Sequence, residues 1–271
     1  MAARDDELLE KARHGDAAAL DALLARHERQ IFRFGLRMCG SEDDAREVLQ
    51  ETLLAAFKNL PGFRGEADLS TWLYQLARSF CIKARRRRVG EPATHDALEG
   101  EPASALPSDA PAPDVQAHAR ELGALLQAAM LALPESHREV VILKDVEGLS
   151  AEEVAKVLGE EVSAVKSRLH RARMQLLQNL GTLLGSAEAA GGEPCPELAE
   201  QLSRYVAHEI DQAACMELEA HLASCARCAG ACAALQRSVS LCRQIPGDAV
   251  PAPVRSAVRQ ALMSMAQPDA P

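Results

Sequence analysis

Hydrophobic side chains recur every three or four residues through most of this chain, and polar residues fill the positions between them. This is the period of an amphipathic α-helix, and the strict alternation of a half-buried strand is missing. In the first part of the chain the pattern predicts helices at 7–13, 17–39, 42–59 and 70–87. The one strand-like run, at 140–143, is too short to override its helical flanks. We therefore expect an all-α protein.

Two stretches without this periodicity divide the chain. Between Arg88 and Arg120 there are five prolines and six acidic residues but no Lys or Arg, a composition that cannot bury enough apolar surface to offset chain entropy. A second break, at 185–194, is rich in small residues. The predicted organisation is a helical module at 1–88, a disordered acidic, proline-rich linker at 89–117, a helical module at 118–183, a linker at 184–194, a cysteine-rich module at 195–245 and a tail with a short amphipathic helix at 246–271.

Composition adds two constraints. The chain has 271 residues, 48% of them hydrophobic, but no run of 18 apolar residues, and its acidic start does not resemble a secretory signal. We therefore expect a cytoplasmic protein with no membrane contact. The net charge is −9, yet 78–88 holds six basic and no acidic residues, and 162–180 holds four basic and no acidic residues. Two basic helices in an acidic protein predict two local contacts with a polyanion.

The second basic segment has the pattern of a helix-turn-helix. Ser150 and Glu153 have the spacing of a capping box at the start of a helix, and Gly159 suits the turn that ends it. In the next helix the apolar stripe consists of Val165, Leu169, Ala172 and Leu176. The side chains that lie off this stripe and are candidates for bases or phosphates in a major groove are Lys166, Ser167, His170 and Arg171. The alternative is a helical hairpin with a solvated basic face.

Residues 133–143, 147–155 and 165–173 together resemble region 4 of the extracytoplasmic-function (ECF) sigma factors of bacteria. The resemblance implies that Lys166, Ser167, His170 and Arg171 face the bases of a −35 promoter element. Where the family usually has Gly-Thr or Ser-Thr before Val-Lys-Ser-Arg, this chain has Ser163 and Ala164. The −35 sequence therefore stays open.

Residues 42–56 are similar to region 2.2 of the same family, the helix that docks on RNA polymerase. On a helical wheel one face is formed by Ala45, Val48, Leu49, Thr52 and Leu53. Glu47, Gln50 and Glu51 lie largely outside that face. An exposed acidic face is usually only solvated, but the resemblance implies that these three residues contact the core polymerase.

Residues 63–78 are similar to regions 2.3 and 2.4. Aromatic rings beside basic residues suit single-stranded DNA, because rings stack on unpaired bases and cations hold phosphates. In the family this segment melts and holds the −10 element. The candidate −10 residues are Phe63, Arg64, Trp72, Tyr74, Arg78, Lys83, Arg85 and Arg86. A core position is an alternative for Trp72. Many relatives have Ala-Arg-Asn where this chain has Ala77, Arg78 and Ser79, which leaves the −10 contact pattern open.

Six of the eight cysteines lie in the last third of the chain, where no secretory signal supports a disulfide framework. His221, Cys225 and Cys228 form a His-x3-Cys-x2-Cys unit, a spacing that suits three ligands of one zinc ion. Cys195 is the candidate fourth ligand, with His208 and Cys215 as competitors. The alternative is a set of small buried cysteines in an Ala-rich helix.

Residues 198–228 resemble the zinc-binding domain of redox-responsive anti-sigma factors. The resemblance implies a domain that packs between sigma regions 2 and 4 and blocks polymerase, with a final helix that also grips the sigma factor. Val254, Val258, Leu262 and Met265 have the helical spacing for such a contact. Two interpretations of the metal-binding module are open. Either zinc is purely structural, or the surplus thiols, such as Cys232 and Cys242, sense oxidants, copper or cadmium.

The resulting hypothesis is an alternative sigma factor of the ECF type, without catalytic residues, fused to a regulatory zinc-binding domain. Its expected partners are core RNA polymerase and promoter DNA, and we expect intramolecular contact between the C-terminal domain and regions 2 and 4. The alternative from another class is a metal- or redox-responsive helix-turn-helix regulator that acts without polymerase. That alternative leaves the region 2 resemblance unexplained.

Overall fold

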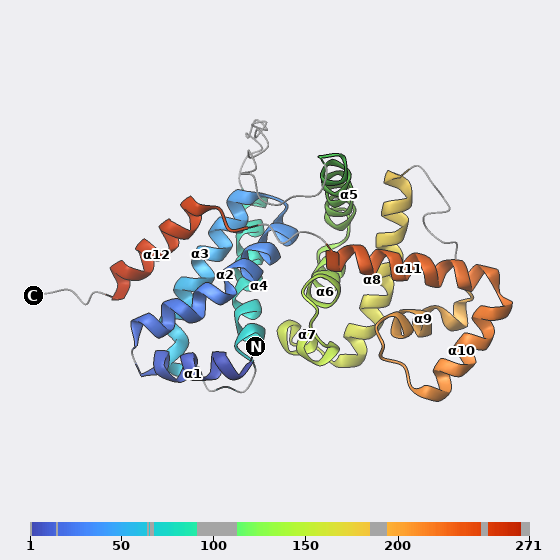
Figure 1. Cartoon of the computed structure of the whole chain (residues 1–271), viewed down its shortest axis with the longest axis horizontal. Coiled ribbons are helices and arrows are strands. Elements are labelled where there is room, and N and C mark those ends of the chain that lie inside the picture. Colours follow the sequence, from blue (N-terminus) through green and yellow to red (C-terminus); the bar gives the residue numbers. More distant parts are fainter. Residues whose placement is uncertain are drawn as a thin grey trace, which may run out of the picture.

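The computed structural model describes residues 2–14, 16–63, 65, 68–90, 113–184, 194–244 and 249–266. Within these ranges the chain forms helices joined by turns, with no β-strand, which confirms the all-α prediction (Figure 1). Most of the two expected linkers, and the candidate Arg64, lie outside the described residues. None of the described helices combines the length and apolarity needed to cross a bilayer.

The first helical body contains α1 (Ala2–Arg13), α2 (Ala17–Cys39), α3 (Glu42–Asn59), the 3-10 turn η1 (Leu60–Gly62) and α4 (Leu69–Gly90). Asp16 caps α2 by accepting a hydrogen bond from Ala19 N at 3.0 Å, and α2 ends at Gly40, whose φ of 75° is left-handed. Helices α2, α3 and α4 pack against one another. The predicted stripe of α3 is confirmed, because the buried side chains of this helix include Ala45, Val48, Leu49, Thr52 and Leu53.

The second body contains α5 (Pro113–Leu131), α6 (Glu135–Val141), the π-helical turn η2 (Ile142–Val146), α7 (Ala151–Leu158) and α8 (Val162–Leu183). The strand-like run at 140–143 is helical, as its flanks predicted. The capping box is present, since Ser150 Oγ accepts from Glu153 N at 3.1 Å and Glu153 Oε2 accepts from Ser150 N at 2.6 Å. Gly159 follows α7 with a φ of 71°, so α7 and α8 form the expected helix-turn-helix.

The C-terminal segment divides into two parts. The turn η4 (Pro196–Leu198) and helices α9 (Ala199–Val206), α10 (Gln212–Ser224) and α11 (Ala226–Gln244) form a small module, which we call the terminal module. Its core contains Leu202, Leu218, Leu235 and Val239 and is completed by Leu177 of α8. Helix α12 (Ala252–Ala266) lies at the opposite end of the molecule and packs against α3 (Figure 1). The C-terminal segment therefore contacts both helical bodies.

The two helical bodies are joined by polar contacts that are largely buried. Glu147 is the centre of one set, because its carboxylate accepts from Arg33 Nε at 2.7 Å and from the Tyr74 hydroxyl at 2.7 Å. Arg138 is the centre of another, and it donates to the backbone carbonyls of Met38, Met130, Leu131 and Leu133. One continuous hydrophobic cluster runs through both bodies. They therefore form a closed unit in this structure.

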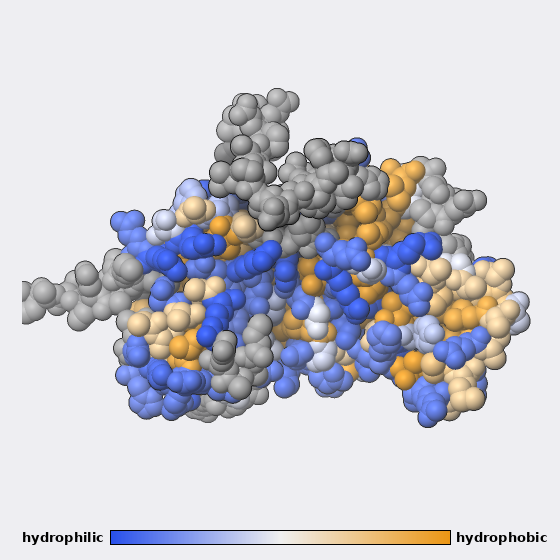
Figure 2. All heavy atoms as spheres, viewed as in Figure 1, coloured by the Kyte–Doolittle hydropathy of each residue, from blue (hydrophilic) through white to orange (hydrophobic). Residues whose placement is uncertain are grey.

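The surface reflects this arrangement. In the view of Figure 2, hydrophilic side chains cover much of the zone where the first and second bodies meet, whereas apolar side chains gather over the terminal module and the end of α8. Leu183 and Leu184, at that end, are 47% and 48% exposed. Three of the candidate −10 residues, Tyr74, Arg78 and Arg85, contact the second body in the polar zone between the bodies.

Candidate nucleic-acid interface and metal centre

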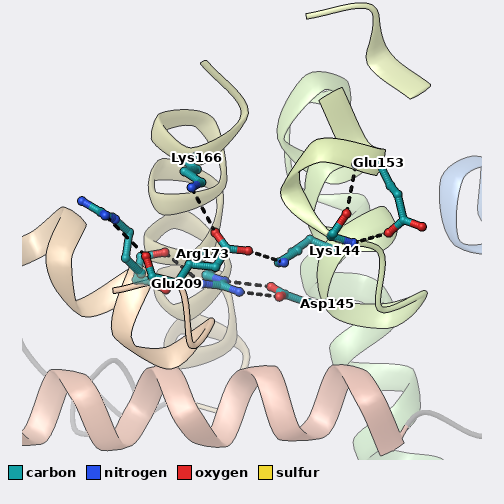
Figure 3. Close-up of polar contacts among 9 residues, drawn as sticks. Lys144, Asp145, Glu153, Lys166, Arg173 and Glu209 are labelled. Carbon is teal, nitrogen blue, oxygen red and sulfur yellow. Dashed lines mark hydrogen bonds and ion pairs between the residues drawn. The ribbon is translucent and has the colours of Figure 1, made fainter. Parts of the chain in front are cut away.

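The outer face of α8 lies beside the terminal module. Glu209, in the turn between α9 and α10, forms an ion pair with Lys144 of η2, and its Oε2 lies 3.8 Å from Lys166 Nζ (Figure 3). The side chains of Lys144 and Glu209 are only 12% and 19% exposed, so water screens this pair weakly. Of the four residues expected to face the −35 bases, Lys166 is therefore held by a carboxylate of the C-terminal segment.

The other three candidates on α8 differ in exposure. Arg171 is exposed, whereas Ser167 and His170 are half-buried. The Nδ1 atom of His170 is buried and has no hydrogen-bond partner among the described residues. Burial lowers the pKa of His170, and the nearby carboxylate of Glu200 on α9 opposes that shift. His170 is therefore neutral at neutral pH.

Arg173, which follows Ala172 of the predicted stripe of α8, is fully buried. Its guanidinium donates to Asp145 in a two-pronged pair, with Nε to Oδ2 at 2.9 Å and Nη2 to Oδ1 at 2.5 Å (Figure 3). Its Nη1 donates to the carbonyl and the hydroxyl of Ser203 on α9, at 2.8 and 2.9 Å. Sequence reasoning counted Arg173 among the basic residues of this helix, but its position four residues after Leu169 was a signal that it lies near the buried stripe.

The basic face of α4 lies against the second body. Arg78 Nε lies 3.1 Å from Glu139 Oε1, and Arg85 Nη1 lies 2.8 Å from Glu135 Oε2. Burial raises the pKa of Glu139, and Arg78 opposes the shift. Tyr74 is buried with its hydroxyl on Glu147. Three of the candidate −10 residues are therefore engaged by acidic side chains of α6 and of the turn after η2.

Of the remaining −10 candidates, Phe63 and Trp72 lie at the loop that precedes α4, whereas Lys83 and Arg86 lie in the C-terminal half of α4. Phe63 is buried and its ring lies 5.0 Å from that of Trp72, which is half-buried, at an interplanar angle of 38°. Lys83 and Arg86 are exposed. Phe63 and Tyr74 also line a groove of 390 Å³ whose other wall includes Gly148 and Leu149 of the second body. In this closed arrangement the second body borders the loop expected to hold a base.

The acidic face of α3 is accessible in part. Glu47, Gln50 and Glu51 are half-buried, and Glu47 accepts from Arg87 Nη1 at 2.8 Å. On the other side of this body, Arg255 of α12 lies 3.3 Å from Glu28 of α2. Val254 and Val258 are buried within the hydrophobic cluster of the first body, whereas the side chains of Leu262 and Met265 lie outside the described residues.

The structure brings the four predicted metal ligands together. The ligand atoms of Cys195, His221, Cys225 and Cys228 all lie within 4.8 Å of one another. Cys225 immediately precedes α11, and a hydrogen bond from the Cys228 backbone N–H lowers the pKa of its thiol to about 7. His221 Nε2 is buried without a hydrogen-bond partner among the described residues. Three thiolates and one unpaired imidazole nitrogen fit a tetrahedral structural zinc site.

The competing ligands lie elsewhere. Cys215 and His208 line a separate pocket of 510 Å³ with Tyr205 and Glu219. Cys232 is buried in the core of the terminal module, and Cys242 is buried beside the Arg173 pair. Burial raises the pKa of both thiols, which makes them poor nucleophiles in this state. The surplus cysteines are thus distributed over three different environments.

Comparison with known families agrees with this geometry. Residues 23–90 match the family described as Sigma-70 region 2, residues 123–176 match Sigma-70, region 4, and residues 195–229 match "Putative zinc-finger". The chain is 32% identical to the ECF RNA polymerase sigma factor SigM of Mycobacterium tuberculosis over 66% of this chain and 86% of that protein. The chain belongs to the ECF family of RNA polymerase sigma factors.

Two further relatives show how much of each protein the similarity covers. The RNA polymerase sigma-H factor of Pseudomonas aeruginosa is 31% identical over 68% of this ECF sigma factor and 97% of the relative. The ECF RNA polymerase sigma factor SigE of Mycolicibacterium smegmatis is 34% identical over 60% of this chain, and the matching segment spans 63% of SigE. As a sigma factor, the protein directs RNA polymerase in transcription initiation. The match to region 2 argues against a regulator that acts without polymerase.

In this sigma factor the two helical bodies correspond to regions 2 and 4, and the terminal module carries the zinc-finger match. The candidates that sequence reasoning missed are acidic. Glu147, Glu139 and Glu209 engage candidate DNA-binding side chains from other parts of the chain. Only the fold shows which acids these are, because the partners lie 73, 61 and 43 positions away in sequence and no short motif connects them.

Proposed function

We propose that the terminal module and α12 are a built-in inhibitor that keeps this sigma factor closed. The observation that carries the proposal is the carboxylate of Glu209 held between Lys144 and Lys166. A DNA phosphate seeks the same kind of lysine pair. Glu209 and promoter DNA would therefore be mutually exclusive ligands of region 4.

The proposal assigns the −35 contacts to Lys166, Ser167, His170 and Arg171. Arg171 is exposed, but Lys166 and His170 lie partly beneath the terminal module. Full contact with a major groove would need the module to move away from α8. The geometry supports inhibition rather than activation, because release of the module frees cationic groups.

For the −10 element, the proposal assigns binding to the eight candidate −10 residues, which lie on α4 and on the loop that precedes it. Tyr74, Arg78 and Arg85 contact Glu147, Glu139 and Glu135 in the closed form. A melted strand would have to replace these three acids. Separation of region 2 from region 4 is thus part of the proposed activation, and the exposed Lys83 and Arg86 would make the first contacts with phosphate.

For the polymerase, the proposal assigns contact to Glu47, Gln50 and Glu51 on α3. Helix α12 packs on this same helix, and Val254 and Val258 are buried there. Polymerase and α12 would therefore both contact α3. We also expect the protein to act in the cytoplasm, where its polymerase partner works.

For the metal, the proposal assigns zinc to Cys195, His221, Cys225 and Cys228. Bound zinc would hold the start of α9, the end of α10 and the start of α11 together, and the folding of so small a module would depend on it. Loss of zinc, exchange for copper or cadmium, or oxidation of these thiols would release the inhibitor. The four ligands are better candidates for such sensing than Cys232 and Cys242, because their ligand atoms form one cluster to which Cys232 and Cys242 do not belong.

The test is a charge reversal in the full-length, zinc-loaded protein. Glu209→Lys places a third cation beside Lys144 and Lys166, so the closed form should open, and run-off transcription with core polymerase should rise several-fold. Glu217→Lys, on the exposed face of α10, makes the same charge change away from the interface and should behave as wild type. Transcription by Glu209→Lys equal to or below that of wild type would overturn the proposal.

A further inference from the structure

Two cysteines outside the terminal module lie together in the first helical body. Cys39 is the last residue of α2, and Cys81 lies in the middle of α4, the helix packed against it. The two thiols share a hydrogen bond, and both line a groove of 290 Å³. The two cysteines are 42 positions apart in the sequence, and neither belongs to the cluster of six near the C-terminal end. Among the described residues, no other cysteine lines this groove.

The surroundings of the two sulfur atoms differ. Cys39 is half-buried and interacts electrostatically with the guanidinium of Arg138. Cys81 is 3% exposed, and the hydrogen bond with Cys39 together with burial raises the pKa of its thiol, with Asp44 and Glu139 acting in the same direction. A cation beside the accessible sulfur favours its thiolate, whereas the buried sulfur keeps its proton. This is the asymmetry of an attacking thiol and a resolving thiol.

We propose that Cys39 and Cys81 form a peroxide-reactive dithiol site that closes reversibly to a disulfide. The Cys39 thiolate attacks one oxygen of a hydroperoxide, the O–O bond breaks, and the leaving oxygen takes a proton to give an alcohol or water. The sulfur of Cys81 then attacks the Cys39 sulfenic acid, loses its proton, and the S–O bond breaks to release water. Two thiols lose two electrons and two protons in total, and the hydroperoxide accepts them.

The position of this site connects it to the contact between regions 2 and 4. The carbonyl of Met38, next to Cys39, accepts from Arg138 Nη1 at 2.7 Å. Gly40, the next residue on the other side, lies so close to Leu131 that a Cβ there would be 2.8 Å from its Cδ1. The end of α2 is thus a docking point for region 4, and the groove beside it is bordered by Glu135 and Arg138 of α6. A disulfide would tie this docking point to α4, independently of the zinc site.

The experiment treats full-length, zinc-loaded protein with hydrogen peroxide and maps disulfides by mass spectrometry. Trypsin cleaves after Arg37, Arg46, Arg78 and Lys83, so the expected product is peptide 38–46 linked to peptide 79–83. Dithiothreitol should reverse the link. Absence of this linked peptide at a peroxide dose that oxidises the zinc-site thiols would overturn the proposal.

Two variants test the assigned roles. In Cys81→Ala, Cys39 should stop at the sulfenic acid and be labelled by dimedone, and in Cys39→Ser neither the link nor the label should form. Cys39 is half-buried, so Cys39→Ser should retain the wild-type helical circular dichroism even if the buried Cys81→Ala does not. Dimedone labelling of Cys81 in Cys39→Ser at the rate seen for Cys39 in Cys81→Ala would overturn the assignment.

Discussion

The C-terminal segment contacts the sigma regions at two interfaces of opposite character. The interface with region 4, which we call the charged interface, combines the apolar contact of Leu177 with polar contacts from Ser203 and Glu209 of the terminal module to Lys144, Lys166 and Arg173. The apolar interface lies on region 2 and consists of Val250, Val254 and Val258, which join the core of the first body. The arginines of α12 at the second interface are about half exposed, so they add little.

The difference indicates a division of roles. Charged contacts at low exposure are directional, and they weaken when a phosphate, a proton or salt competes for one partner. Burial of valine is non-directional and depends on the apolar area removed from water, at about 25 cal/mol per Å². We therefore expect the charged interface to respond to signals and the apolar interface to keep α12 attached while the terminal module moves.

Zinc removal should give the largest effect and should separate the two interfaces. A structural zinc site contributes on the order of 10 kcal/mol or more to folding, so chelation should unfold α9–α11 and remove the charged interface. Helix α12 should stay protected from hydrogen exchange, because its valines pack on region 2 rather than on the terminal module. Hydrogen exchange with mass spectrometry before and after chelation measures both segments.

Two variants accompany that experiment. The double variant Cys225→Ser/Cys228→Ser should show the same hydrogen-exchange pattern as the protein after zinc chelation. Cys215→Ser, which lies outside the four ligands, should not. If α12 loses protection together with α9–α11 in chelated protein, the two interfaces act as one unit and the proposed division of roles is wrong.

Asp145→Ala should give the next largest effect. It leaves the guanidinium of Arg173 buried with only Ser203 as partner, and breaking a buried ion pair in this way costs about 3–5 kcal/mol. The free energy of unfolding from urea titration checks this value. Asp43→Ala removes an exposed pair with Arg46 and should cost less than about 1 kcal/mol. Equal losses of unfolding free energy in the two variants would show that the buried ion pair contributes no more to stability than the exposed pair.

The sequence allowed good predictions wherever a local period or spacing decides the structure. The stripe of α3, the capping box at Ser150 and the His221, Cys225 and Cys228 spacing all lie within one or two helices. Helix periodicity and ligand spacing are short-range properties, so a single sequence displays them. The all-α fold was predicted for the same reason.

Contacts between distant segments could not be predicted. The Glu209 carboxylate lies in a turn and has no feature that distinguishes it from any solvated acid, yet it holds Lys144 and Lys166. Tyr74 has the sequence context of a base-stacking ring, but its hydroxyl finds Glu147 in the closed form. Such pairs depend on how region 4 packs against region 2 and against the terminal module, and side-chain chemistry alone is compatible with many partners.

Val258→Ala should have a moderate effect confined to the apolar interface. Removal of two buried methyl groups costs about 1–2 kcal/mol, and the loss should appear as faster hydrogen exchange in α12 with no change in α9–α11. Gln260→Ala, on the exposed face of the same helix, should exchange like wild type. Faster exchange in α9–α11 would mean that the apolar contact supports the terminal module as well.

The smallest expected effect is a pH response of the charged interface through His170. Burial lowers the pKa of His170 from 6.5, against the pull of Glu200, while Arg173 and Arg171 act in the same direction as burial. Between the ordinary and the lowered pKa the unfolded chain binds more protons than the folded chain. The contribution of His170 to stability is therefore full above pH 6.5 and falls as the pH drops below it.

Urea midpoints at pH 7.5 and pH 5.5 measure the slope of stability against pH, and His170→Gln should reduce this slope. His14→Gln, whose ring is 75% exposed on α1, is the matched control and should retain the wild-type slope. A slope unchanged in His170→Gln would assign the pH response to other groups and leave the charged interface sensitive only to salt and phosphate.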